Sequence, residues 1–171
     1  MNQSLWVYIW RFQPFHNGHK SIIDTMIKDN DKNLILIWVS REWNGEENPF
    51  PYEKRLWFIL NTYHSPTPYI YPLIDHPSDE AWVRQILWIW HVQNADHIKF
   101  YCGDKNQDSA IKAIEEHKKL FIWKDIEMVE IPRNKLPISW TQIRHEIKQE
   151  GVESIKNLVP GWVYKQLKKT G

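Results

Sequence analysis

Two histidines stand three residues apart in the segment Arg11 to His19, which reads RFQPFHNGH. The segment follows a short apolar run, Leu5 to Trp10, and precedes a stretch with helical spacing, so it is expected to lead from a strand into a helix. A helix start offers unpaired N–H groups and partial positive charge, and both favour phosphate. His16 and His19 can donate hydrogen bonds to phosphate oxygens, and Gly18 lets the backbone come close. Metal binding, or a capping histidine beside a solvent-facing one, is the alternative.

A second candidate lies far along the chain, where Ile138 to Arg144 reads ISWTQIR. Ser139 and Gln142 have the S-x-x-Q spacing of a capping box, which predicts the start of a helix. Arg144 would stand about one turn into that helix. Such a start presents N–H groups, hydroxyls and a forked guanidinium, and these can hold phosphate from the side opposite the two histidines.

The hydrophobic pattern predicts the scaffold that positions both segments. Short apolar runs of β-branched and aromatic residues each precede a longer segment with helical spacing, which is typical of βαβ units around a parallel sheet. The predicted strands cover residues 5–10, 34–39, 69–74, 98–101 and 127–131. The predicted helices cover residues 17–28, 52–63, 78–93, 108–118 and 139–148, with two short helices within 154–169 that divide at Pro160 and Gly161.

This alternation predicts a single α/β domain over residues 1–171, with a C-terminal helical segment at about 154–169. Its core is expected to be a doubly wound five-stranded parallel sheet with helices on both faces. In open α/β sheets ligands bind beyond the carboxyl ends of the strands, so the loops there are expected to form the site. One of them, residues 40–50, is polar and holds the turn signals Asn44-Gly45 and Asn48-Pro49.

Composition excludes several other classes. The 22 Lys and Arg residues nearly balance 21 Asp and Glu, so the net charge of +1 gives no reason to expect nucleic acid or an anionic membrane as partner. No apolar run approaches the roughly 18 residues of a membrane span, and no signal-like segment stands at the start, so a cytoplasmic location is expected. The single cysteine excludes an internal disulfide. The unusual feature is the presence of 11 Trp and only 6 Gly.

The histidine segment resembles the signature of the HxGH-motif nucleotidylyltransferase superfamily. It is most similar to the archaeal-type nicotinamide mononucleotide (NMN) adenylyltransferases, in which the segment runs G-R-F-x-P-x-H-x-G-H. ISWTQIR resembles the second motif of that superfamily, I-S-x-T-x-I-R. Further similarity extends over nearly the whole chain, in Asn48-Pro49-Phe50 with Arg55 beyond it, in Asp75, in Trp82-Val83 and in Phe100 to Asp104.

The resemblance implies a Rossmann-like nucleotidylyltransferase fold with strand order 3-2-1-4-5. It implies an enzyme of NAD biosynthesis that transfers AMP from ATP to NMN and yields NAD and pyrophosphate. Mg²⁺ would arrive on the ATP phosphates rather than in a metal site of the protein, and the chain would form a homo-oligomer. His16, His19, Arg11 and Arg144 would be catalytic, with His19 stabilising the transferring α-phosphate.

The resemblance also assigns residues to the two substrates. The ATP-binding set would be Phe12, Gln13, Pro14, Gly18, Gly103, Asp104, Ser139, Thr141 and Ile143. The NMN-binding set would be Trp82, Val83, Asp75, Asn48, Phe50 and Ser40. The sequence pattern alone suggests a core tryptophan at position 82, whereas the resemblance implies a surface that stacks on the nicotinamide ring.

Three tryptophans stand where the family usually has a small residue: Trp10, Trp38 and Trp140. Small residues at such places let the backbone approach a nucleotide closely. Either the indoles turn outward or stack on the bases, which leaves a working enzyme with altered substrate fit, or they weaken nucleotide binding. Two alternatives to an NMN adenylyltransferase therefore stay open. One is the same chemistry with nicotinate mononucleotide, phosphopantetheine or FMN as acceptor, and the other is a catalytically weakened nucleotide-binding module.

Overall fold

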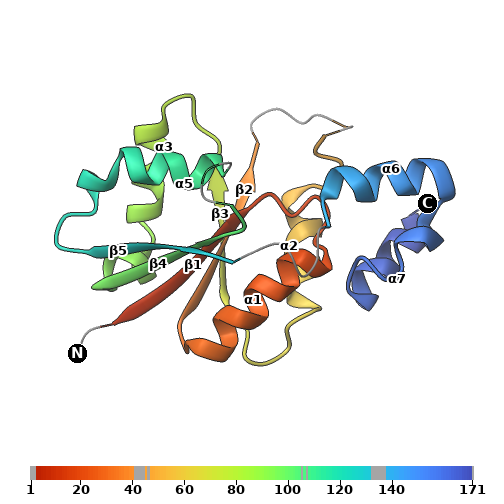
Figure 1. Cartoon of the computed structure of the whole chain (residues 1–171), viewed down its shortest axis with the longest axis horizontal. Coiled ribbons are helices and arrows are strands. Elements are labelled where there is room, and N and C mark those ends of the chain that lie inside the picture. Colours follow the sequence, from red (N-terminus) through yellow and green to blue (C-terminus); the bar gives the residue numbers. More distant parts are fainter. Residues whose placement is uncertain are drawn as a thin grey trace.

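Five parallel strands form one sheet in the order β3-β2-β1-β4-β5 (Figure 1). The computed structural model describes residues 3–40, 45, 47–104, 106, 108–131 and 138–170. The strands are β1 (Ser4–Trp10), β2 (Asn33–Val39), β3 (Tyr69–Ile74), β4 (His97–Cys102) and β5 (Asp125–Glu130). Each lies within two residues of its predicted bounds. The order confirms the predicted doubly wound α/β fold.

The helices follow the strands in alternation. They are α1 (Asn17–Asp29), α2 (Tyr52–Leu60), α3 (Asp79–Leu87), α4 (Trp90–Gln93), α5 (Ser109–Glu116), α6 (Trp140–Glu150) and α7 (Gly161–Thr170). Among the described residues, the 3₁₀ segments η1 (Lys118–Leu120) and η3 (Val152–Ile155) follow α5 and α6. In the part of the chain that the structure describes, no helix has the length and apolar character needed to span a bilayer.

Two buried clusters cover the two faces of the sheet. Leu5, Val7 and Ile9 of β1 pack with residues of α3 and α5, whereas Tyr8 packs with α1, α2, α6 and α7. Successive side chains of a strand point to opposite faces, so β1 is buried on both sides, as expected at the centre of a parallel sheet. Figure 1 shows α3 and α5 on one side of the strands and α1 and α2 on the other.

The edge strand β3 accommodates a proline. Pro72 stands opposite Ile37 of β2, and a proline, which cannot donate to the ladder, is tolerated where one side of the strand has no neighbour. The neighbouring strand β2 is buried from Leu34 to Ile37. Its continuous apolar pattern therefore reflects burial on both faces, as predicted.

One predicted helix is wrong in its extent. The segment expected to run from position 78 to 93 ends as α3 at Leu87, and α4 begins only at Trp90. Ile89 between them has an extended backbone (φ −72°, ψ 124°), which breaks the helical hydrogen-bonding pattern. The chain then returns Val92 and Ala95 to the buried cluster beside α3. The helix expected to extend to position 63 likewise ends earlier, at Leu60.

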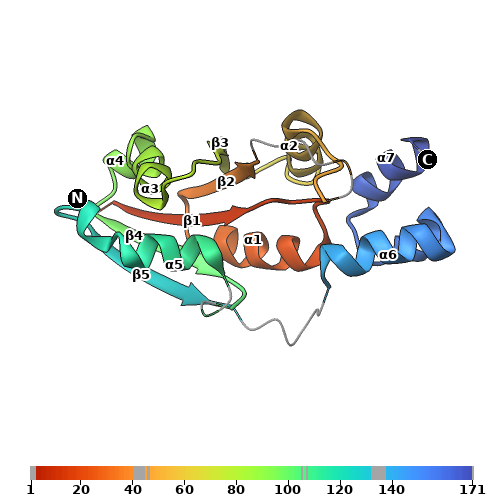
Figure 2. The ribbon, with the colours of Figure 1, turned by 90° about the horizontal axis from the view of Figure 1, so that it is seen from above.

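Helices α6 and α7 lie beyond the carboxyl end of β1, next to the start of α1 (Figure 2). The backbone N–H of Asn17 donates to the carbonyl of Leu158 at 2.9 Å, and its side chain donates to the carbonyl of Asn157 at 2.9 Å. The C-terminal segment therefore closes one end of the carboxyl edge, where the predicted site residues lie.

Candidate functional site

His16 and His19 cap the N-terminus of α1 with their imidazoles. Nδ1 of His16 accepts from the backbone N–H groups of Gly18 (3.1 Å) and His19 (3.4 Å), and Nδ1 of His19 accepts from the N–H of His16 (3.3 Å). The two rings form a reciprocal capping box and stack with their centroids 3.6 Å apart. Both residues are buried.

These capping bonds determine the chemistry that each ring can offer. Because Nδ1 accepts from the backbone in both residues, the neutral form of each ring carries its hydrogen on Nε2. Donation to phosphate would therefore use Nε2 while Nδ1 continues to cap the helix. For His16, capping and phosphate binding, which the sequence presents as alternatives, use different ring nitrogens. The Nε2 atom of His19 is buried in this structure, so a phosphate would reach it only if the residues around the ring move apart.

The two sequence motifs meet at Gly18. A Cβ atom at this position would lie 2.9 Å from Cε1 of His16 and 3.7 Å from the carbonyl oxygen of Ile138. The first contact is closer than side chains tolerate, so the stacked histidines require glycine here. The second contact shows that the segment before α6 lies against the start of α1, as the motifs predict.

Helix α6 begins with only half of the predicted capping box. Oγ of Ser139 accepts from the backbone N–H of Gln142 at 3.2 Å, but the Gln142 side chain donates to Glu146 at 2.8 Å. Glu146, one turn further on, competes successfully for that amide. Arg144 lies in the second turn of α6, and its guanidinium lies directly over the indole of Trp140.

The loop after β1 is tied to the loop after β2. The Gln13 side-chain amide donates to the carbonyl of Phe50 at 2.9 Å and accepts from its N–H at 2.9 Å. Phe12 takes a left-handed conformation (φ 53°), which is uncommon for a residue other than glycine and which turns the chain toward α1. Phe12 and Pro14 are buried. These members of the predicted ATP and NMN sets therefore shape the loop.

The remaining members of the ATP-binding set are more dispersed. After β4, Gly103 is buried, and the carboxylate of Asp104 accepts from the N–H of Asn106 at 2.9 Å. On α6, Thr141 is exposed, whereas the side chain of Ile143 is fully buried in the cluster beneath α6 and α7. Ile143 could therefore contact a ligand only through its backbone.

The predicted nicotinamide platform is covered by another tryptophan. Trp82 is only 3% exposed and packs against Trp38, with ring centroids 5.0 Å apart and planes tilted by 44°. The Nε1 atoms of both indoles are buried and find no hydrogen-bond acceptor among the described residues. Val83 is fully buried in the same cluster. Trp82 is thus part of the core in this structure.

The other members of the NMN-binding set lie at the ends of β2 and β3. The backbone N–H of Asp75 donates to the carbonyl of Val39 at 2.8 Å, and its carboxylate accepts from the N–H of His76 at 3.1 Å. Ser40 and Asn48 are half-buried. They flank residues 41–44 and 46, so the predicted Asn44-Gly45 turn lies partly outside the described residues.

Arg55 of α2 is a site residue that the sequence analysis left out of both substrate sets. Its Nη1 donates to the carbonyl oxygens of Arg11 (2.7 Å) and Trp38 (2.8 Å), and the residue is 3% exposed. Burial, followed by repulsion from Arg11, lowers the pKa of this guanidinium to about 10, so it stays charged at neutral pH. The helical pattern around Arg55 gives no sign of burial, and only the family's N-P-F segment with a following arginine could have indicated it.

A cavity of about 130 Å³ lies beyond the carboxyl ends of β1 and β2, beside the starts of α5 and α6. The strand order reverses between β1 and β4, and ligands bind at such switch points in open α/β sheets. Small-molecule sites usually measure about 300–1,000 Å³, so this cavity is narrow. Its lining residues are Ile9, Trp10, Arg11, Gln13, Trp38, Asp108, Ser109, Ala110 and Trp140. Trp10, Trp38 and Trp140, which the resemblance places where the family usually has a small residue, therefore all line it.

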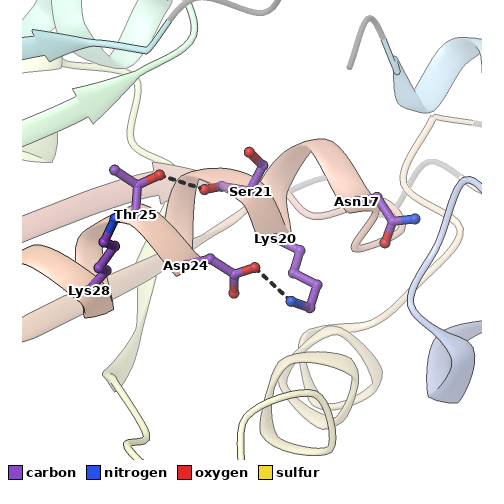
Figure 3. A pocket seen from close by; sticks show the side chains of 6 residues that line it. All are labelled: Asn17, Lys20, Ser21, Asp24, Thr25 and Lys28. Carbon is purple, nitrogen blue, oxygen red and sulfur yellow. Dashed lines mark hydrogen bonds and ion pairs between the residues drawn. The ribbon is translucent and has the colours of Figure 1, made fainter. Parts of the chain in front are cut away.

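A larger pocket of about 480 Å³ lies elsewhere, along the exposed side of α1 (Figure 3). Lys20 and Asp24 form an ion pair there at 2.6 Å, and the hydroxyl of Thr25 donates to the carbonyl of Ser21 at 2.9 Å. Asn17 and Lys28 lie at opposite ends of this side of the helix, with the ion pair between them (Figure 3). The lining groups bond along the helix rather than converge on a ligand, so pocket size does not identify the site.

The chain belongs to the Cytidylyltransferase-like family, whose model matches residues 7–149. The nicotinamide-nucleotide adenylyltransferase of Methanocorpusculum labreanum is 35% identical over 83 residues, which cover 47% of this chain and 49% of that protein. The nicotinamide/nicotinic acid mononucleotide adenylyltransferase of Acinetobacter baylyi is 25% identical over 179 residues, covering 95% of this chain and 90% of that protein. The match to the archaeal relative thus spans about half its length.

A solved structure shows the same fold. The bifunctional NMN adenylyltransferase/ADP ribose pyrophosphatase of Francisella tularensis is 24% identical and superimposes with a TM-score of 0.71, covering 99% of this chain and 49% of that one. Another structure of that description is complexed with AMP and a Mn ion. At this level of identity the likeness establishes the Rossmann-like nucleotidyltransferase fold.

Proposed function

We propose that this chain is a nicotinamide-nucleotide adenylyltransferase that transfers AMP from ATP to NMN. The observation that carries the proposal is the stacked His16 and His19 pair at the start of α1, held against the start of α6. The names of the relatives from Methanocorpusculum labreanum and Acinetobacter baylyi support it. In this proposal residues 1–171 act as a single nucleotidylyltransferase domain.

The reaction would proceed by positioning and charge neutralisation, without a covalent enzyme intermediate. An oxygen of the NMN 5′-phosphate forms a bond to the α-phosphorus of ATP, the bond from that phosphorus to the oxygen bridging to the β-phosphate breaks, and pyrophosphate leaves. Nε2–H of His19 would donate to the α-phosphate and Nε2–H of His16 to the neighbouring phosphate oxygens. The guanidinium groups of Arg11 and Arg144 would hold the phosphates from two sides.

Mg²⁺ is proposed to arrive on the ATP phosphates, where it would supply further neutralisation of their charge. The two carboxylates that follow β4 accept hydrogen bonds from the backbone through Oδ1. Asp104 accepts from the N–H of Asn106 at 2.9 Å, and Asp108 accepts from those of Ala110 (3.0 Å) and Ile111 (3.3 Å). Among the described residues no three His, Cys, Asp or Glu side chains are grouped to hold a metal ion.

The two substrates would occupy opposite sides of the carboxyl edge. ATP would contact the loop after β1, the start of α6 and the loop after β4, through the ATP-binding set given by the resemblance. NMN would lie beside the ends of β2 and β3, near Ser40, Asn48 and Asp75. Because Trp38 covers Trp82, Trp82 would support this side from beneath rather than present an open face.

The narrow cavity favours a second candidate, a nucleotide-binding module with weak or no turnover. Three indoles line a space of about 130 Å³, which is smaller than ordinary nucleotide sites. This candidate predicts binding of ATP or NAD without release of pyrophosphate. Nicotinate mononucleotide, phosphopantetheine and FMN are the alternative acceptors if the chain is active.

A homo-oligomer is also part of the proposal. Trp88 is 78% exposed and Trp90 65% exposed, and large aromatic residues are favoured at the centres of interfaces. They lie close to the exposed edge strand β3, whose Tyr69 stacks on His91. Light scattering of the purified chain measures the oligomeric state, and a monomer at working concentration would contradict this part of the proposal.

One assay tests the activity and its acceptor together. The chain is incubated with ATP and each acceptor, with and without Mg²⁺, and NAD is measured by its enzymatic reduction to NADH while pyrophosphate release is measured separately. We expect Mg²⁺-dependent NAD formation with NMN. If pyrophosphate is released only with another acceptor, that acceptor replaces NMN in the proposal. If calorimetry shows ATP binding but no product forms, the result favours the binding module.

A further inference from the structure

Each of the three tryptophans at small-residue positions contacts one of the predicted phosphate-binding groups. The guanidinium of Arg11 lies 4.9 Å from the ring centroid of Trp38, and that of Arg144 lies over Trp140. The ring of Trp10 lies 5.9 Å from that of His19 at an angle of 56°. The indoles thus lie against the chemistry-bearing groups and do not turn outward.

Trp38 is held in place from two sides. Its indole packs against the buried Trp82, and its backbone carbonyl accepts a hydrogen bond from Nη1 of Arg55 at 2.8 Å. The same Nη1 donates to the carbonyl of Arg11 at 2.7 Å. Arg55 therefore joins the backbones of the two residues whose side chains stack on each other. A glycine at position 38 would keep the backbone link but could not provide the ring.

The stacking leaves the guanidinium able to bind phosphate. An indole contacts the face of a guanidinium, whereas phosphate oxygens bind its N–H edge, so one guanidinium can do both at once. Among the described residues no carboxylate or carbonyl is hydrogen-bonded to the Arg11 side chain, so the ring of Trp38 is what orients it. An arginine held this way loses less rotamer freedom when it binds an anion.

We propose that Trp38 is a positioning residue that holds the guanidinium of Arg11 in a phosphate-binding orientation, and that Trp140 does the same for Arg144. The inference rests on the proposed function for the identity of the anion, the phosphates of ATP. In this proposal the indoles that narrow the cavity also orient the arginines, so they contribute to phosphate binding.

The test compares variants that fill the same space with and without an aromatic face. Trp38→Phe keeps a ring beneath Arg11, whereas Trp38→Leu keeps apolar volume against Trp82 without one. The dissociation constant of MgATP is measured by calorimetry for both and for the unaltered chain. We expect Trp38→Leu to weaken binding roughly 3- to 30-fold, the range of a cation–π contact, and Trp38→Phe to stay within about threefold of the unaltered chain.

A double-mutant cycle separates positioning from packing. In the Arg11→Ala background, Trp38→Leu should have little further effect on ATP affinity, because the group that it positions is gone. If Trp38→Leu binds ATP more tightly than the unaltered chain, Trp38 occludes the site and the proposal is wrong. If Trp38→Leu lowers ATP affinity by the same factor in the Arg11→Ala background, Trp38 has only a packing role. Melting curves confirm that each variant is folded.

The same measurements distinguish this inference from the proposed function. A chain that binds ATP but forms no NAD contradicts the adenylyltransferase, yet the comparison of Trp38→Phe with Trp38→Leu still decides the role of the indole. A chain that binds no ATP contradicts both. The same design applies to the second pair, with the variants Trp140→Phe and Trp140→Leu measured alone and in the Arg144→Ala background. If these two Trp140 variants bind MgATP with equal affinity, Trp140 does not position Arg144.

Discussion

The two sides of the carboxyl edge differ in how their residues are arranged. The phosphate side comprises the loop from Arg11 to His19 and the start of α6, and its histidines stack 3.6 Å apart. The acceptor side comprises the ends of β2 and β3 together with α3, and there Trp82 lies beneath Trp38. On the first side hydrogen bonds to the backbone hold the predicted phosphate-binding histidines, whereas on the second Trp38 packs over Trp82, the predicted ligand-binding side chain.

The two sides differ in whether the backbone or neighbouring side chains fix the position of the predicted ligand-binding rings. Hydrogen bonds to backbone N–H groups hold His16 and His19, so the geometry follows from the path of the chain. Among the described residues no hydrogen bond holds the ring of Trp82, and its position follows from packing in the buried cluster, with Trp38 against it. In this structure the ring that the resemblance assigns to nicotinamide lies in the core, with Trp38 packed against it.

The largest expected effect comes from the phosphate side. His19→Ala should lower kcat for NAD formation by about 10²- to 10³-fold, because it removes a donor aimed at the charge that develops on phosphate. His145→Ala, at an exposed position on α6, is the control and should leave the rate unchanged. Unaltered turnover in His19→Ala would show that His19 does not stabilise the transferring phosphate.

On the acceptor side a mutation should change stability before it changes substrate binding. Trp82→Phe should lower the free energy of unfolding by about 1–3 kcal/mol, because it leaves a gap in a buried cluster, while the KM for NMN stays the same. Trp88→Phe, at a residue that is 78% exposed, serves as the control. If instead the KM rises several-fold at unchanged stability, Trp82 is an open platform and the contrast between the sides fails.

Arg55 links the two sides, so its replacement should affect both moderately. Arg55→Lys keeps the charge but loses the Nη1 atom that bridges the carbonyls of Arg11 and Trp38. We expect the unfolding free energy to fall by about 1–3 kcal/mol, measured by urea titration. Arg84→Lys is the matched control at the surface. The exposed ion pair of Arg84 with Glu80 should contribute less than about 1 kcal/mol to the free energy of unfolding. Equal effects of the two changes would contradict the bridging role.

The smallest effect is expected at the larger pocket along α1. Lys20→Ala removes the ion pair with Asp24 and should change the free energy of unfolding by less than about 0.5 kcal/mol, with unchanged turnover. Steady-state kinetics and a melting curve check this. A marked loss of ATP affinity would show that the site extends onto this exposed side of α1.

The scaffold and the start of α1 at the two histidines could be predicted from the sequence because their signals are local, whereas phosphate binding there stays a prediction. Strand positions follow from apolar runs, and the start of α1 follows from a strand that leads into RFQPFHNGH. The break at Ile89 and the competition of Glu146 for Gln142 depend on tertiary context, so the helix pattern and the capping pattern missed them.

The acceptor side could not be predicted for a different reason. Trp38 covers Trp82, and Arg55 is buried between two carbonyls. Both arrangements join residues that lie on separate elements. The sequence marked Trp38 as unusual, but the direction of its ring and its contact with Arg11 follow only from the packing of β2 against α3. The resemblance names these residues but does not determine how their side chains pack.

A crystal structure with a non-hydrolysable ATP analogue and Mg²⁺ tests the central claim most directly. We expect the phosphates to contact Nε2 of His16 and His19 and the N–H edge of Arg11, while the guanidinium of Arg11 stays over the ring of Trp38. A triphosphate bound elsewhere, or bound here only after Trp38 has left Arg11, would contradict it.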